Sequence, residues 1–130
     1  ADAMNLVARK RKKYLVQKEP FSEMERVPEI DAYIHKQKFK NKERQICWFT
    51  NLQKHDLGLA FQKNYLLLNW QQGSGKTAAA YHYAKYQLHE KKVTNIVVLA
   101  PAIATSITWE AFLTLHNEKF IVAKRLKDLE

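Results

Sequence analysis

The sequence W-Q-Q-G-S-G-K-T, residues 70–77, directly follows the apolar run Y-L-L-L-N. Gly73 and Gly75 let backbone N–H groups approach an anion without a Cβ atom in the way. Lys76 supplies a mobile cation for the β and γ phosphates of a nucleotide, and the hydroxyl of Thr77 is placed to bind Mg²⁺. We therefore predict that this segment is a phosphate-binding loop at the N-terminus of a helix.

One position departs from the standard pattern G-x-x-x-x-G-K-[ST], because Trp70 stands where that pattern has glycine. The second half of the pattern, G-S-G-K-T, is intact. It lies between an apolar run and an alanine-rich segment, which makes it far more specific than G-K-T alone. The alternative interpretation is that the two glycines only make a turn and that Lys76 is solvated.

The residues around the loop predict an α/β fold. Short apolar runs are typical of strands buried on both faces, and longer runs with three- and four-residue spacing are typical of helices. The expected strands are residues 65–70, 95–100 and 120–123, and the expected helices are residues 77–90 and 104–115. This alternation is that of a parallel sheet with right-handed crossovers and flanking helices.

The N-terminal part has a different composition. Residues 1–17 carry the basic cluster Arg9–Lys13, for which we expect a short basic helix that is a solvated arm, a nucleic-acid-binding arm or an import signal. Two prolines then mark a linker, so we expect an arm and linker at residues 1–28 and a domain at residues 29–130.

The first part of that domain has apolar residues at three- and four-residue spacings between residues 30 and 64. This spacing predicts one or two amphipathic helices that precede the sheet. We expect breaks near Lys40 to Lys42 and at Gly58.

Composition narrows the class of partner. The formal net charge is +9 and the pI is about 9.7, which favours an acidic partner, most often nucleic acid.

Cys47 is the only cysteine, so no internal disulfide can form and the chain is compatible with a reducing compartment. No apolar run approaches the ~20 residues of a membrane helix, and we expect a soluble intracellular protein without a membrane partner. Because the chain starts with alanine and stops without a closing feature, we also expect a piece of a longer protein.

A second motif lies downstream, at residues 97–112, V-V-L-A-P-A-I-A-T-S-I-T-W-E-A-F. Its apolar run stops at Pro101, which predicts a tight turn at the carboxyl edge of the sheet, where open α/β folds bind ligands. Trp109 and Phe112 are three residues apart on one helical face and could equally be core residues.

Together, L-L-L-N-W-Q-Q-G-S-G-K-T and I-V-V-L-A-P-A-I-A-T-S-I-T-W-E-A-F resemble motifs I and Ia of superfamily 2 helicases and translocases. The resemblance is nearest to the Swi/Snf-like branch and to large-DNA-virus transcription ATPases such as the poxvirus early transcription factor small subunit. It covers residues 44–112 and implies a partial RecA-like domain that binds ATP and Mg²⁺. It also implies nucleic acid, DNA or RNA, the remainder of a helicase core and transcription machinery as partners.

The resemblance assigns roles to individual residues. Triphosphate and magnesium would be held by Gly73, Ser74, Gly75, Lys76 and Thr77, the last two being the catalytic residues of the parent enzyme. Gln45 lies at about the distance at which the family places an adenine-contacting glutamine, with Gln53 as a competing candidate. Pro101, Ala102 and Thr105 match a segment that touches the sugar-phosphate backbone.

The family's acidic pair, D-E-x-H or D-E-A-D, has no counterpart here. After Phe112 the acidic residues are Glu118, Asp128 and Glu130, none of which follows a convincing apolar strand. Because phosphoryl transfer requires these acids, we expect the chain to bind a nucleotide without hydrolysing it efficiently.

Three alternatives remain open. The first is a non-catalytic basic module that binds nucleic acid or protein, and the second is a small-molecule kinase, which residues 101–109 argue against. The third is base stacking on the helix after the loop by Tyr81, Tyr83 and Tyr86, for which core packing is the competing interpretation.

Overall fold

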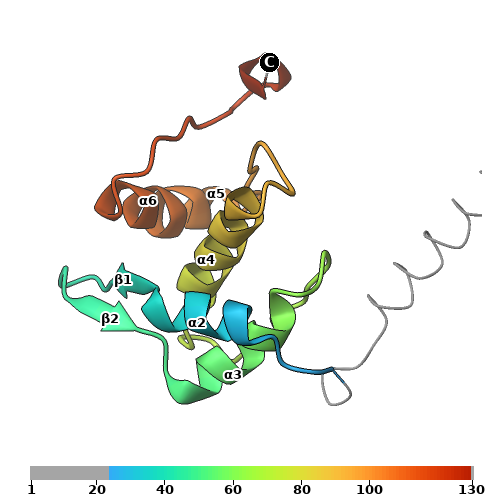
Figure 1. Cartoon of the computed structure of the whole chain (residues 1–130). Coiled ribbons are helices and arrows are strands. Elements are labelled where there is room, and N and C mark those ends of the chain that lie inside the picture. The colour runs from blue at the N-terminus through green and yellow to red at the C-terminus, as the bar shows by residue number, and fades with distance from the viewer. Residues whose placement is uncertain (1–23, 130) are drawn as a thin grey trace, which may run out of the picture. The chain divides into compact units, whose positions relative to one another are not determined.

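The computed structural model describes residues 24–129 of the chain (Figure 1). The described residues form two compact units: unit 1 contains residues 24–38 and 48–94, and unit 2 contains residues 39–47 and 95–129. The predicted basic arm with Arg9–Lys13 lies outside the described residues.

Helices make up most of the regular structure in the described residues. In the first half, the elements are α2 (Pro28–Lys36), β1 (Lys38–Lys40), β2 (Ile46–Trp48) and α3 (Asn51–Ala60). In the second half, they are α4 (Lys76–His89), α5 (Ala102–Ala104), the π-helical segment η2 (Thr105–Glu110), α6 (Ala111–Leu115) and the 3₁₀ turn η3 (Leu126–Leu129).

The predicted RecA-like α/β fold with a parallel sheet is wrong. The only sheet among residues 24–129 is the two-stranded antiparallel pair of β1 and β2, neither of which was an expected strand. Residues 65–70, 95–100 and 120–123 have no strand partner in the described part of the chain. Tyr65, Leu67 and Leu99 are 78%, 86% and 93% exposed, so these apolar runs are not the doubly covered strands that a parallel sheet requires.

The strands β1 and β2 form a hairpin that the sequence analysis missed. Its turn is closed by the hydrogen bond from Arg44 N–H to Asn41 O (3.0 Å). Arg44 adopts a left-handed conformation (φ 63°), as the last residue of a three-residue hairpin loop commonly does. The break expected near residues 40–42 is therefore this hairpin between two helices.

Helix α2 begins with a proline at its first turn and follows the charge pattern that a helix dipole favours, with Glu29 and Asp31 at its start and His35 and Lys36 at its end. Helix α3 begins with a capping box, in which the Thr50 hydroxyl accepts from Gln53 N–H (3.2 Å) and the Gln53 side chain accepts from Thr50 N–H (2.8 Å).

The helix break expected at Gly58 is wrong, because Gly58 lies inside α3. A Cβ atom there would lie 2.3 Å from Asp31 Oδ1 and 2.5 Å from Arg26 Nη2. Those two groups form an ion pair at 2.9 Å. Glycine therefore makes room for this ion pair against the helix, rather than ending the helix.

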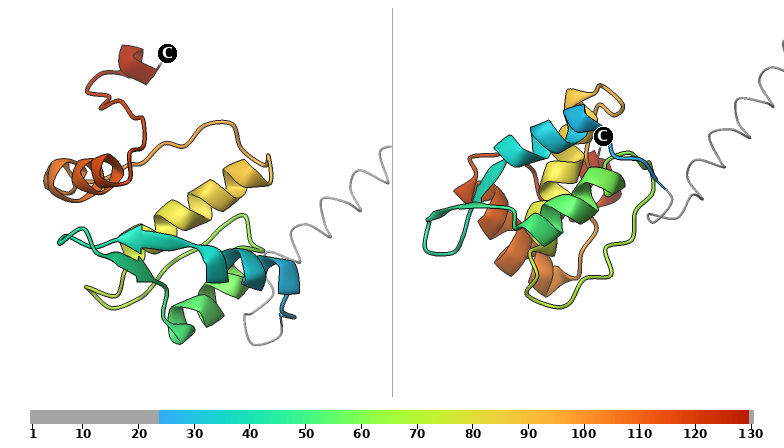
Figure 2. Two further views of the ribbon diagram at one scale, coloured as in Figure 1. Left: turned by 60° about the vertical axis from the view of Figure 1, so that its left-hand side comes forward. Right: turned by 60° about the horizontal axis from the view of Figure 1, so that its bottom comes forward.

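The helix predicted for residues 77–90 is confirmed as α4, which packs with α2 and α3 around the core of unit 1 (Figure 2). The rings of Tyr33 on α2 and Tyr86 on α4 lie 5.2 Å apart, and Phe61, which caps α3, lies 5.0 Å from Tyr86. Tyr86 is 7% exposed, which confirms core packing for this tyrosine. The buried apolar side chains of the described residues all belong to unit 1: Ile30, Ile34, Phe49, Leu57, Leu59, Ala60, Phe61, Ala78, Ala79 and Tyr86.

Unit 2 contains the helix predicted for residues 104–115, which is confirmed as the continuous stretch α5, η2 and α6. The hydroxyl of Thr105 donates to Pro101 O (3.1 Å) and Ser106 Oγ to Ile103 O (3.4 Å). Such bonds from Ser and Thr side chains compete for helical carbonyl groups, which accounts for the wider π geometry that begins at Thr105.

Tyr83 provides a pH-dependent test of unit 1. Its hydroxyl donates to Lys63 O (2.5 Å), and burial raises its pKa above the ordinary 10.0. The folded state thus holds this proton more tightly than the unfolded state. We expect the free energy of unfolding to be level below about pH 10 and to fall as the pH rises toward the folded-state pKa. Urea unfolding from about pH 8 to about pH 11 measures this.

The variant Tyr83→Phe is the control for that experiment. It loses about 1 kcal/mol at neutral pH with its hydrogen bond, but its stability should fall less steeply in alkali. The remaining pH dependence of the free energy of unfolding comes from Tyr33 and Tyr86, because burial also raises their pKa values. The same alkaline decrease in both proteins would show that Tyr83 ionisation does not contribute.

Candidate functional site

The predicted phosphate-binding loop forms the connection into α4. Gly73 and Gly75 both have left-handed backbones, with φ 80° and 86°, and Gly75 is the N-cap of α4. An L residue with a side chain rarely adopts this conformation, which explains why both positions are glycine. A Cβ atom at Gly73 would have no atom within 4 Å, so this part of the loop is open to an incoming group.

The start of α4 presents backbone donors at the end of this loop. The first helical hydrogen bond runs from Ala79 N–H to Gly75 O (3.1 Å). The N–H groups of the residues between them therefore have no acceptor within the helix. Together with the helix dipole, these donors favour an anion at this end.

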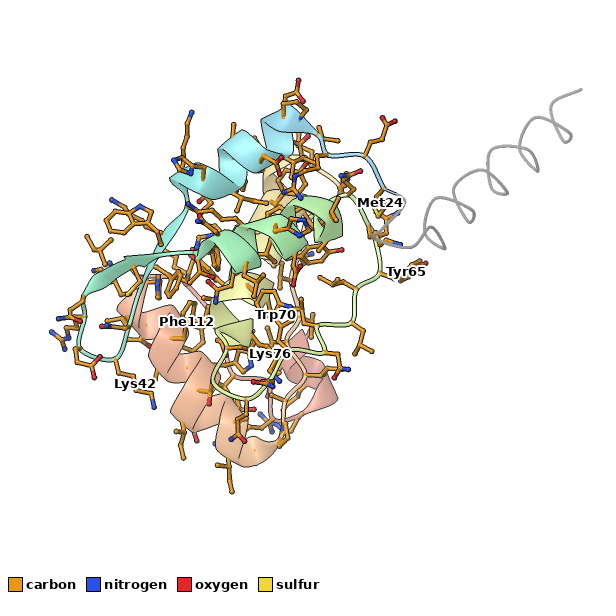
Figure 3. All side chains as sticks on the ribbon, turned by 90° about the horizontal axis from the view of Figure 1, so that it is seen from below. Met24, Lys42, Tyr65, Trp70, Lys76 and Phe112 are labelled. Carbon is orange, nitrogen blue, oxygen red and sulfur yellow. The ribbon has the colours of Figure 1, made fainter. Side chains whose placement is uncertain are left out.

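Lys76 is the first residue of α4 and is exposed. Its Nζ atom donates to Trp70 O (3.0 Å), which places the ammonium group beside the loop; both residues are labelled in Figure 3. Thr77 follows it in the first turn and is half-buried, and the Ser74 hydroxyl donates to Gln71 O. The structure thus brings Gly73, Ser74, Gly75, Lys76 and Thr77 together on one turn.

Helix α3 supports the loop through Gln53. The Gln53 side-chain amide donates to Ser74 O (2.8 Å) while its oxygen completes the capping box of α3. A Cβ atom at position 75 would lie 2.9 Å from Gln53 Nε2, which gives a second reason for glycine there. Gln53 was predicted only as a competitor to Gln45, although the T-x-x-Q pattern from Thr50 is typical of a capping box.

A second contact between α3 and the loop involves the residue that departs from the standard pattern. The indole Nε1 of Trp70 donates to Asp56 Oδ2 at 3.2 Å. Trp70 is half-buried, and Asp56 lies one helical turn after Gln53 on α3. No pattern in the sequence pointed to this pair.

Gln45 belongs to unit 2, whereas the loop belongs to unit 1. Gln45 lies at the end of the hairpin turn, where its side-chain oxygen accepts from Asn41 Nδ2 and its N–H donates to Asn41 Oδ1, both at 2.9 Å. These bonds give the side chain a structural role in closing the turn. Its assignment to adenine stays a prediction.

Pro101, Ala102 and Thr105 lie together at the start of the helical stretch of unit 2. Pro101 is the N-cap of α5, and both it and Ala102 are exposed. Thr105 is half-buried and donates its hydroxyl back to Pro101 O, so the exposed N-terminal turn is the part of this segment that can meet a ligand.

The acidic residue Asp128 caps the turn of η3. Its Oδ2 atom accepts from the N–H groups of Lys124 (3.0 Å) and Arg125 (3.1 Å). These bonds occupy the carboxylate in its own turn. The loop itself offers a ligand the backbone donors at the start of α4, the Lys76 ammonium group and the Thr77 hydroxyl.

Among residues 24–129, no group of three or more His, Cys, Asp and Glu side chains is placed to hold a metal ion. In the same part of the chain, no helix has the length and apolar character needed to cross a bilayer. A scan against protein-family models and searches of curated proteins and solved structures found no match to this chain.

Proposed function

We propose that the loop of residues 73–77 binds the phosphates of MgATP and that the chain is the ATP-binding portion of a nucleic-acid helicase or translocase. The observation that carries this proposal is the pair of left-handed glycines, Gly73 and Gly75, immediately before the N-terminus of α4. The resemblance of the two sequence motifs to superfamily 2 supports the choice of ATP and of nucleic acid.

The residues of the loop fit a triphosphate. Backbone N–H groups at the start of α4 and the Lys76 ammonium group supply donors for phosphate oxygens, and Thr77 supplies a hydroxyl for magnesium. When phosphate binds, the Lys76 ammonium group can keep one N–H on the Trp70 carbonyl and donate another to a phosphate oxygen. Without the acidic pair, we expect binding and no efficient hydrolysis.

Titration with a fluorescent ATP analogue, with and without magnesium, tests the proposal. We expect saturable binding that magnesium strengthens and that inorganic tripolyphosphate displaces. The matched variants Thr77→Ser and Thr77→Ala separate the role of the hydroxyl: Ser keeps the effect of magnesium and Ala removes it. If the unmodified protein binds the analogue equally well with and without magnesium, the proposal is wrong.

A basic nucleic-acid-binding module is the second candidate, and the turn of the hairpin favours it. Lys42 and Arg44 are exposed on this turn, and Lys40 precedes them. The turn shares unit 2 with Pro101 and Ala102, and Lys40 N–H donates to His116 Nε2 (2.9 Å) just after α6. Glu43, also exposed, lies between Lys42 and Arg44, so the turn keeps a positive but partly offset charge. Unit 2 thus carries both this basic turn and the segment expected to meet a sugar-phosphate backbone.

Titration with a single-stranded oligonucleotide at several salt concentrations tests this second candidate. Each side chain that neutralises one phosphate adds about 0.7 to the slope of log K against log salt, so Lys42→Gln/Arg44→Asn should reduce that slope by about 1.4. Asparagine is chosen because it tolerates the left-handed backbone of Arg44. The control is Lys91→Gln/Lys92→Gln in unit 1. Equal slopes for both double variants would exclude the turn as the binding surface.

A further inference from the structure

The geometry points to Trp70 and Asp56 as a positioning pair, which holds the first half of the phosphate-binding loop on α3 so that Lys76 is aimed at the ligand. This inference rests on the proposed function. It concerns two residues that the standard loop pattern does not contain, one of which, Trp70, replaces a glycine of that pattern.

Trp70 makes two attachments, one through its side chain and one through its backbone. Its indole Nε1 donates to Asp56 Oδ2 (3.2 Å), and its carbonyl oxygen accepts from Lys76 Nζ (3.0 Å). The indole thus fixes the position of the peptide group that holds the ammonium group. Glycine at this position would keep the carbonyl but lose the side-chain attachment.

Asp56 is oriented for this contact. Its Oδ1 atom lies 3.6 Å from His55 Nδ1, which leaves Oδ2 for the indole. The carboxylate side chain is 40% exposed, so solvent weakens the bond without removing it. The second half of the loop is held separately, because Gln53 on the same helix donates to Ser74 O.

Two attachment points along α3 therefore restrain the loop before any ligand arrives. A loop that is already ordered loses less conformational entropy when it binds, and this raises affinity without a new contact to the ligand. Breaking the Trp70–Asp56 bond should then weaken MgATP binding even though neither side chain touches phosphate.

The most informative variant is Trp70→Gly, which restores the first glycine of the standard pattern. If the pattern alone decided affinity, this change would strengthen binding or leave it unaltered. We expect instead that Trp70→Gly, Trp70→Phe and Asp56→Ala each weaken MgATP binding roughly fivefold, the factor for one partly exposed hydrogen bond. Asp56→Asn keeps an acceptor oxygen and should restore most of the affinity.

The double variant Trp70→Phe/Asp56→Ala shows whether the residues act as a pair. We expect it to lose no more affinity than either single variant. The matched control, Trp109→Phe, removes an indole from unit 2 and should leave MgATP affinity unaltered. If the double variant loses affinity by the product of the two single-variant factors, Trp70 and Asp56 act independently and do not form a positioning pair.

A ligand-free measurement separates failure of the pair from failure of the proposed function. The chain has three tryptophans and hence three indole N–H resonances in a nitrogen–proton correlation spectrum. Asp56→Ala should shift only the resonance that Trp70→Phe removes. Wild-type affinity in Trp70→Phe, or an unshifted indole resonance in Asp56→Ala, would overturn the inference alone. A wild-type protein that does not bind MgATP would overturn the proposed function and this inference with it.

Discussion

Phe61→Ala is expected to destabilise unit 1 by about 3–5 kcal/mol, because it removes a fully buried ring and leaves a cavity. Phe61 is 0% exposed and its ring contacts Tyr33, Tyr83 and Tyr86, with centroids at 6.4, 5.8 and 5.0 Å. Small domains have a total stability of about 5–15 kcal/mol, so this variant should lose much of it. Equilibrium urea unfolding, followed by circular dichroism, measures the change.

The control for that experiment is Leu67→Ala. Leu67 is 86% exposed in the extended segment before the loop, and such substitutions usually change stability by less than about 0.5 kcal/mol. A loss as large as that of Phe61→Ala would mean that residues 65–70 are buried, contrary to the structure.

Lys76→Ala is expected to reduce the affinity for MgATP by about 10- to 100-fold, the effect of losing a charged hydrogen-bond donor to phosphate. Lys76 is exposed and its ammonium group donates to the exposed loop at Trp70 O, so loss of the side chain should leave the stability of the fold almost unchanged. Titration of MgATP by calorimetry measures the affinity.

Lys91→Ala removes the same charge at an exposed position after α4 and serves as the control. Because the net charge of +9 attracts any anion, this comparison separates the loop from general electrostatic attraction. Equal loss in both variants would assign the binding to net charge and not to the loop.

The helices were predictable where their apolar spacing was sustained. Residues 77–90 and 104–115 carry that spacing without an internal proline, and both are helical in the structure. The capping box at Thr50 and Gln53 could also have been predicted, because its T-x-x-Q pattern lies within four consecutive residues. In the loop, Gly73 and Gly75 were predicted to leave room for an anion, and their left-handed backbones are a finding of the structure.

The sheet was not predictable, for a physical reason. A run such as residues 95–100 is apolar whether it lies between two layers or is extended in solvent, and its sequence alone cannot supply a hydrogen-bonding partner. The hairpin of β1 and β2 escaped notice because its strands have three residues each and its turn lacks the Asn-Gly or Asp-Gly signal.

The contacts that hold the loop escaped notice for a different reason. Asp56 and Trp70 are 14 residues apart, and Gln53 and Ser74 are 21 apart. Pairs at such separations depend on how α3 lies against the loop, which no local pattern records. The sequence could therefore indicate the residues proposed to meet the phosphate, but not those that hold them in place.

Selective nitrogen-15 labelling of glycine shows whether MgATP binds at the loop, because the chain has three glycines and two of them are in the loop. We predict that MgATP shifts the amide resonances of Gly73 and Gly75 and leaves that of Gly58, inside α3, unmoved. Saturation with MgATP that leaves the two loop resonances in place, or shifts all three alike, would contradict the account.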